Sequence, residues 1–267
     1  MRTGPASLVR REFPFLILLF TLACATTGPG GQKSLIFIGS GTEVSMGKQA
    51  EAEVLAGSKL LADTAWQGYL SRVGRSLSQF SERRDVEYRF SVLESSEINA
   101  FALPGGPLFI YTGFLKLMED ESELAAVLGH EIGHVDGRHA VRQMQPVVGI
   151  SAIEALAFGD KSPAARQALN LVLGLALTGY SRSYELEADQ FGLIYMSRAG
   201  YDPNGTVRMF GKLAGMQKGE RNIFEKLSAT HPETRERIAK LEAEIKKRPS
   251  GGTTGREFYQ QMKKRLP

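Results

Sequence analysis

Residues 123–139 read ELAAVLGHEIGHVDGRH and contain three of the four histidines of this 267-residue chain. His130 and His134 are four positions apart, and Glu131 follows the first of them. Residues with this spacing share one face of an α-helix, so both imidazoles can reach the same ion. The apolar residues recur at helical spacing on a neighbouring face (Leu124, Val127, Leu128, Ile132 and Val135). The stretch therefore predicts a core helix over residues 121–138 that presents two metal ligands to a cleft.

A third ligand is needed if the ion is catalytic, because a catalytic zinc keeps its fourth position open for water. Glu185 and Asp189 are spaced i, i+4 in SYELEAD and share a helix face, so one carboxylate can complete the site. The other can hold a ligand imidazole through its far N–H. His139 is the alternative third ligand, but it lies about 140° around the helix from His134. We expect one Zn²⁺ per chain, with His139 behind the ligands or in the core.

Composition allows one folded domain with a sizeable core, since 42% of the residues are hydrophobic. The net charge of +4 is small, and no Lys/Arg cluster alternates with aromatic residues. The sequence therefore gives no reason to expect a nucleic-acid partner. No internal repeat with a period of 20 to 50 residues is present.

The N-terminus is typical of an exported protein. Three arginines precede an apolar run over residues 13–23, which is too short to cross a hydrocarbon core about 30 Å thick. The run ends in TLAC and is similar to a bacterial lipoprotein signal, in which cleavage precedes a cysteine that receives lipid. Cys24 is the only cysteine, and a lone thiol cannot form an internal disulfide. We expect lipidation at Cys24, a periplasmic location and an outer-membrane anchor. The alternative is that the apolar run forms a short anchor or a buried helix, and the choice between Sec and twin-arginine export is left open.

The expected organisation follows from composition. Residues 1–23 are the signal peptide, and residues 24–43 are the lipidated cysteine with a flexible Gly/Thr/Pro-rich tether. Residues 44–248 form the folded domain, and residues 249–267 form a short basic tail.

Hydrophobic periodicity predicts an α+β fold that is mostly helical with a small β-sheet. Strands are expected over 86–93 and 107–115, with a turn in NAFALPGG (99–106). The chain is expected to be helical from about residue 44 to residue 77. Further helices are expected near 121–138, 148–158, 164–180, 183–199, 205–217 and 232–247.

Four blocks together resemble the zinc metallopeptidases related to HtpX and the CAAX prenyl endopeptidases, peptidase family M48. They are INAFALPGGPLFIYTGFL, ELAAVLGHEIGHVDGRH, SRSYELEAD and THPETRERI. The similarity spans roughly residues 44–247 and is closest to soluble, periplasmic, lipoprotein-type members. It implies a zincin-type, gluzincin-like domain in which His130, His134 and Glu185 bind zinc. It also implies that Glu131 is the catalytic glutamate and that Asp189 lies beside the site with a proton-donor role.

The resemblance also implies how the substrate is held, because in this family an edge strand beside the zinc helix pairs with an extended peptide. Asn99 and Ala100 are the expected substrate contacts. His231 lies in THPE, which fits a capping box at a helix start. Its role is left open between a catalytic transition-state donor, a switchable fourth zinc ligand and a plain surface histidine.

The expected function is zinc-dependent hydrolysis of peptide bonds in misfolded or misassembled cell-envelope proteins. Unfolded envelope polypeptides are the expected partners, together with a membrane through the N-terminal lipid. The alternative is a chaperone-like assembly factor for outer-membrane proteins whose zinc site is mostly latent.

Overall fold

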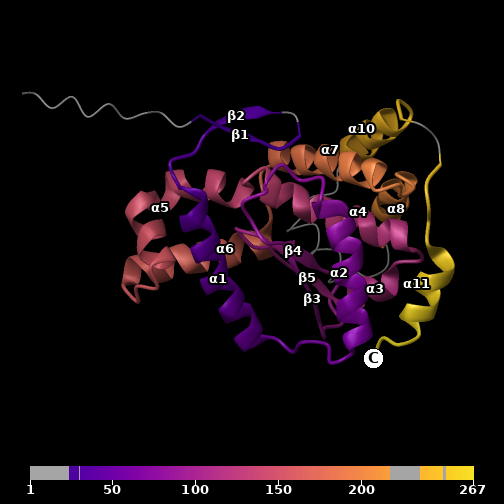
Figure 1. Ribbon diagram of the computed structural model, residues 1–267, viewed down its shortest axis with the longest axis horizontal. Helices are drawn as coiled ribbons and strands as arrows, with labels where there is room; N and C mark the ends of the chain where they lie inside the picture. Colours follow the sequence, from indigo (N-terminus) through magenta and orange to yellow (C-terminus); the bar gives the residue numbers. More distant parts are fainter. Residues whose placement is uncertain (1–23, 30, 217–234, 249–250) are drawn as a thin grey trace, which may run out of the picture.

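The computed structural model describes residues 24–29, 31–216, 235–248 and 251–267 (Figure 1). The signal peptide expected over 1–23 and His231 lie outside the described residues. The first elements are β1 (Cys24–Thr27), β2 (Gln32–Leu35), α1 (Ser40–Gly57), α2 (Thr64–Ser78), β3 (Arg89–Leu93), β4 (Ala100–Ala102), β5 (Pro107–Tyr111) and α3 (Thr112–Leu117). They are followed by α4 (Glu121–Asp136), α5 (His139–Ala157), α6 (Pro163–Thr178), α7 (Arg182–Arg198), α8 (Asn204–Met216), α10 (Arg235–Ile245) and α11 (Arg256–Lys263). The predicted α+β class, mostly helical with a small sheet, is confirmed.

The main sheet has three strands in the order β3-β5-β4, so β4 lies at an edge. β3 pairs with β5 in parallel and β4 pairs with β5 in antiparallel. The predicted strand 107–115 is too long, because the chain turns into α3 after Tyr111. The Thr112 hydroxyl donates to the Ser95 carbonyl at 2.8 Å, and the Gly113 N–H donates to the same oxygen at 2.8 Å. These bonds bend the backbone away from the sheet.

Helix α4 lies at the centre of the domain, where it packs against α2, α7, α8 and the edge strand β4. Asp120 caps its first turn, because its side chain accepts a hydrogen bond from the Glu123 N–H. The helix ends before Arg138, which adopts the left-handed conformation with φ 52°. This residue turns the chain so that α5 begins at His139. The predicted helix at 148–158 is therefore only the second part of α5, which is kinked at Gly149.

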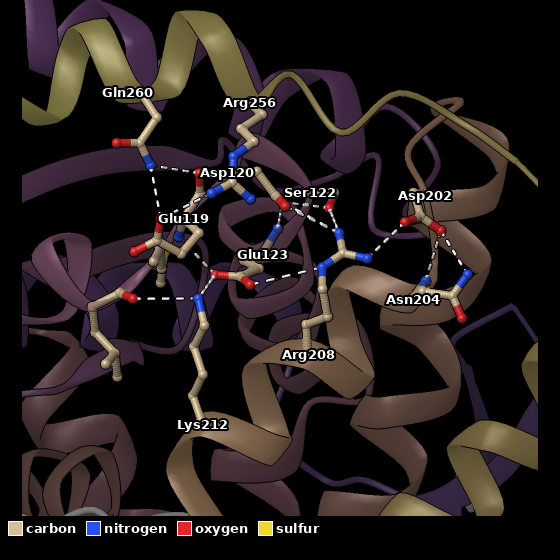
Figure 2. A network of polar contacts seen from close by, with 12 residues as sticks. Glu119, Asp120, Ser122, Glu123, Asp202, Asn204, Arg208, Lys212, Arg256 and Gln260 are labelled. Carbon is tan, nitrogen blue, oxygen red and sulfur yellow. Dashed lines mark hydrogen bonds and ion pairs between the residues drawn. The ribbon is translucent and has the colours of Figure 1, made fainter. Parts of the chain in front are cut away.

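A polar network joins α8 to the acidic first turn of α4 (Figure 2). Arg208 donates to Ser122 at 2.7 Å and to Asp120 at 3.1 Å, and Lys212 pairs with Glu123 at 2.6 Å. Asp120, Ser122 and Glu123 are almost fully buried, so these partners satisfy groups that would otherwise be costly to bury. The network fixes the position of α8 beside α4.

The segment expected to be a flexible tether, residues 24–43, is ordered along most of its length. Its strands β1 and β2 pair in antiparallel, and Gly31 donates to the Gly28 carbonyl to close the turn between them. Ile36 and Ile38 are buried, and α1 begins at Ser40. Gly28 and Gly31 supply the positive φ angles of the tight turn between the two strands.

The segment expected to be a basic tail, residues 249–267, includes α11, which packs on the domain. The Tyr259 hydroxyl donates to the Leu115 carbonyl at 2.7 Å, and the Trp66 indole donates to the Met262 carbonyl at 2.9 Å. Tyr259 and Met262 belong to the main hydrophobic core. The domain therefore extends beyond residue 248. Within the described residues, none of the helices combines the length and apolar character needed to span a membrane.

Replacing Tyr259 with phenylalanine is expected to lower the free energy of unfolding by about 1–2 kcal/mol, because the buried Leu115 carbonyl loses its partner. Urea denaturation measures the change. Gln261→Ala, at an exposed position of the same helix, is the control and should change the value by less than about 0.5 kcal/mol. Equal stability of wild type and Tyr259→Phe would show that the hydrogen bond from Tyr259 to Leu115 contributes little to the fold.

Candidate active site

Two helices approach each other closely where the candidate ligands lie. Glycines of α4 face Ala188 and Gly192 of α7. A Cβ atom on Gly133 would lie only 2.9 Å from the Ala188 carbonyl oxygen, and one on Gly192 would lie 3.0 Å from the His130 backbone nitrogen. Because no side chain separates the backbones here, ligands on α4 can reach carboxylates on α7.

His130, His134 and Glu185 converge where α4 and α7 approach each other. Their potential ligand atoms all lie within 4.8 Å of one another. The two Nε2 atoms are 3.0 Å apart, and each lies 3.4 Å from a different oxygen of Glu185. Ligand atoms bound at 2.0–2.1 Å to a tetrahedral ion are about 3.3 Å apart, so this spacing suits zinc without a large rearrangement. The expected zincin-type grouping of two histidines and a downstream glutamate is confirmed.

Asp189 and Arg237 lie directly behind the three converging side chains. Asp189 contacts the outer nitrogen of His130, Nδ1, at 2.9 Å. Arg237 of α10 donates two hydrogen bonds of 2.8 Å to Asp189, and its guanidinium also lies 3.0 Å from Glu185. Burial raises the pKa of Asp189, but the charge of Arg237 outweighs burial and holds this pKa below its usual value. Asp189 is therefore an ionised acceptor that orients His130.

Arg237 was missed by the sequence analysis, although it lies in the THPETRERI block. It is 1% exposed and its guanidinium packs over the Phe210 ring at 4.8 Å. The sequence pointed to Arg237 only in so far as it belongs to that block. The spacing of an arginine does not show that its side chain will be buried.

The pKa values of His130 and His134 are shifted in opposite directions. Burial lowers the pKa of His130, but the carboxylates of Asp189 and Glu185 outweigh it and raise this pKa to about 10. Burial lowers the pKa of His134 well below its usual value. In the absence of a metal, these shifts favour a proton on His130 over one on His134, and a metal ion bound to His130 would displace that proton.

Glu131 is 3% exposed and lines a cavity beside the three converging side chains. Ala100 of the edge strand, His130 and Arg237 also line this cavity. The rest of the lining is apolar and comes from Phe114, Ala126, Val127, Met209, Phe210 and Leu213. The cavity thus combines an acidic group, an edge strand and room for an apolar side chain.

The remaining residues that the sequence singled out lie in three other places. Asn99 is buried but does not line this cavity, and its backbone carbonyl accepts a hydrogen bond from Tyr111 in the sheet. His139 is fully buried behind His134 and faces its outer nitrogen. Cys24 is the first described residue, in β1.

The chain is similar in sequence to a known protein family and to several known proteins. The family model described as Peptidase family M48 matches residues 64–245. The chain is 34% identical to the mitochondrial metalloendopeptidase OMA1 of Schizosaccharomyces pombe over 176 residues, which cover 65% of this chain and 51% of the relative. It is 27% identical to the beta-barrel assembly-enhancing protease of Escherichia coli over 237 residues, 82% of this chain and 47% of the relative. It is 29% identical to the E. coli metalloprotease LoiP over 181 residues, 66% of this chain and 69% of the relative.

The chain spans about half the length of the first two relatives. All three relatives are named as metalloendopeptidases, metalloproteases or proteases. The region matched by the family model, residues 64–245, contains His130, His134 and Glu185. With the family model covering more than half of the sequence, this chain belongs to the metallopeptidases of peptidase family M48.

Proposed function

We propose that this protein is a zinc-dependent endopeptidase that cleaves misfolded or misassembled proteins of the cell envelope. The observation that carries the proposal is the buried convergence of two imidazoles and one carboxylate at 3.0–3.4 Å from one another. A donor set of two imidazole nitrogens and one carboxylate favours zinc over magnesium or calcium, which prefer oxygen ligands. His130, His134 and Glu185 would hold one ion.

The bound ion would lower the pKa of the water molecule attached to it and would polarise the carbonyl group of the substrate. Glu131, which lines the cavity beside His130, would accept the proton of the attacking water and deliver it to the leaving amine nitrogen. Asp189 would keep His130 in its binding orientation and, because Arg237 holds it ionised, would act as an acceptor and not as the proton donor. We keep His231 as the candidate donor to the transition state, from a segment outside the described residues.

The surroundings of the site favour an extended, unfolded substrate. β4 is hydrogen-bonded to β5 on one side only among the described strands, and its Ala100 reaches the cavity. A peptide added along the edge of β4 that does not pair with β5 would be held mainly by backbone hydrogen bonds, which select little for sequence. The apolar lining would take a hydrophobic side chain of the kind that folded proteins bury and misfolded ones expose.

The proposed location rests on the N-terminus and on the relatives. Lipidation of Cys24 would anchor the domain to the outer membrane on its periplasmic side. The name of the E. coli beta-barrel assembly-enhancing protease points to envelope proteins as the setting for such a relative. Unfolded envelope polypeptides are accordingly the proposed substrates.

Removal of the metal tests the proposal. Unlipidated protein that begins at Cys24 is expected to cleave unfolded casein, to lose this activity on dialysis against a zinc chelator and to regain it with one equivalent of Zn²⁺. Fragments on a gel and zinc content by mass spectrometry are the measurements. Absence of cleavage by zinc-loaded protein, together with suppression of casein aggregation, would contradict the proposal and favour a chaperone.

A further inference from the structure

His134, one of the two candidate histidine ligands, contacts a third histidine, His139. The outer nitrogen of His134, Nδ1, lies 2.8 Å from Nδ1 of His139, the first residue of α5. The far nitrogen of His139, Nε2, lies 3.5 Å from an oxygen of Glu187 in α7. Glu187 in turn accepts hydrogen bonds of 3.1 Å from Arg142. A chain of polar contacts therefore runs from His134 through His139 and Glu187 to Arg142. Its weakest link is the 3.5 Å contact between His139 and Glu187, which is longer than an ordinary hydrogen bond and leaves Nε2 of His139 without a hydrogen-bond partner.

The turn at Arg138 makes this chain possible. An uninterrupted helix would place residue 139 about 140° around the axis from residue 134. The left-handed Arg138 instead begins α5 with His139 directed back at His134. His139 consequently meets the nitrogen that faces away from His130 and Glu185, which explains why it supports the ligand set without belonging to it.

Two tyrosines hold the imidazole planes. Tyr180 stacks on His134 with ring centroids 4.3 Å apart, and Tyr184 stacks on His139 at 4.6 Å with an interplanar angle of 9°. Arg142 covers Tyr184 at 4.4 Å. His139 is fully buried and Glu187 is 7% exposed, so neither ring nor carboxylate can readily exchange its partner for water.

We propose that Glu187 and His139 are positioning residues that fix the tautomer of His134 for metal binding. A carboxylate without a proton only accepts hydrogen bonds, so the approach of Glu187 to within 3.5 Å of Nε2 favours the tautomer of His139 that carries its proton on this nitrogen. Nδ1 of His139 is then an acceptor, and His134 must carry its own proton on Nδ1 to donate to it. The Nε2 lone pair of His134 is thereby left facing His130 and Glu185, which is the form that ligates a metal.

This inference rests on the proposed metal site, and metal affinity tests it separately. Competition with a chromophoric chelator gives the Kd for Zn²⁺, and thermal unfolding of the metal-free protein reports on the fold alone. His139→Leu is expected to raise the Kd about 10–100-fold, the usual effect of losing such an outer partner. His139→Gln should restore part of the affinity, because its amide oxygen can accept from His134 Nδ1–H.

Glu187→Leu is expected to raise the Kd by less than His139→Leu does, because the proton on His139 is then free to occupy either nitrogen. In the His139→Leu background the same change should leave the Kd unaltered, because Glu187 acts only through His139. An unchanged Kd in His139→Leu, or equal effects of Glu187→Leu in both backgrounds, would overturn the inference. Wild-type protein that binds no zinc would instead overturn the proposed function.

The wild-type protein provides a test that does not depend on any variant folding. The chain has only four histidines, so long-range ¹H–¹⁵N spectra of the zinc-loaded protein contain four imidazoles to assign. We expect the proton of His139 on Nε2 and that of His134 on Nδ1. A proton on Nδ1 of His139, or zinc bound to His139, would overturn the assignment.

Discussion

Replacing Glu131 with glutamine is expected to lower kcat/KM for peptide cleavage by about 10³-fold while zinc remains bound. Glutamine has nearly the same shape as glutamate but cannot accept the proton of the attacking water. The zinc content should not change, because Glu131 is not among the three converging ligands. A quenched fluorescent peptide with an apolar side chain beside the scissile bond gives the rate, and mass spectrometry gives the metal content.

The same Glu→Gln change at Glu154, an exposed position of α5, is the matched control and should leave kcat/KM unaltered. Two results would contradict the assigned role. Cleavage at the wild-type rate by Glu131→Gln would mean that another group takes the proton. Loss of zinc from this variant would mean that Glu131 contributes to the metal site itself.

The convergence of the candidate ligands could be predicted in part, because part of it depends on local helix geometry. The spacing between His130 and His134 fixes their shared face whatever the tertiary structure is. The same reasoning placed Glu185 and Asp189 together on α7, and the four helices α4, α6, α7 and α8 lie where periodicity predicted them. What the spacing left open was which carboxylate meets the imidazoles, and the structure brings Glu185 to both and Asp189 to the outer side of His130.

The parts that were not predicted depend on contacts between distant segments. Arg237 is buried only because α10 packs on α7 and α8. Tyr259 and Met262, three positions apart, form the apolar face of α11, but the surrounding lysines and arginines made the segment look like a solvated tail. The orientation of His139 required the turn at Arg138, a residue type that gives no warning of a positive φ angle.

Replacing Gly133 with valine is expected to destabilise the domain by about 1–3 kcal/mol and to lower kcat/KM of the surviving folded protein about 100-fold. The Cβ atom would lie 2.9 Å from the Ala188 carbonyl oxygen and 3.0 Å from its Cα, and both are backbone atoms that a rotamer change cannot move. The helices α4 and α7 must therefore separate, which carries Glu185 away from His130 and His134. Urea denaturation of the metal-free protein measures the first effect, and the rate of cleavage of the quenched fluorescent peptide measures the second. Zinc affinity reports whether Glu185 has moved away from the two histidines.

Gly192→Val tests the same approach of α4 and α7 from the opposite helix, where the new Cβ would lie 3.0 Å from the His130 nitrogen. It should also weaken zinc binding, although residue 192 is not adjacent to any ligand in the sequence. Gly68→Val is the matched control, because Gly68 is exposed in α2 and a Cβ atom there would meet nothing within 4 Å, so this variant should preserve both stability and affinity. If Gly133→Val and Gly192→Val bind zinc as tightly as Gly68→Val, close helix approach is not what brings Glu185 to the two histidines, and the separation of the ligands must be set by another contact.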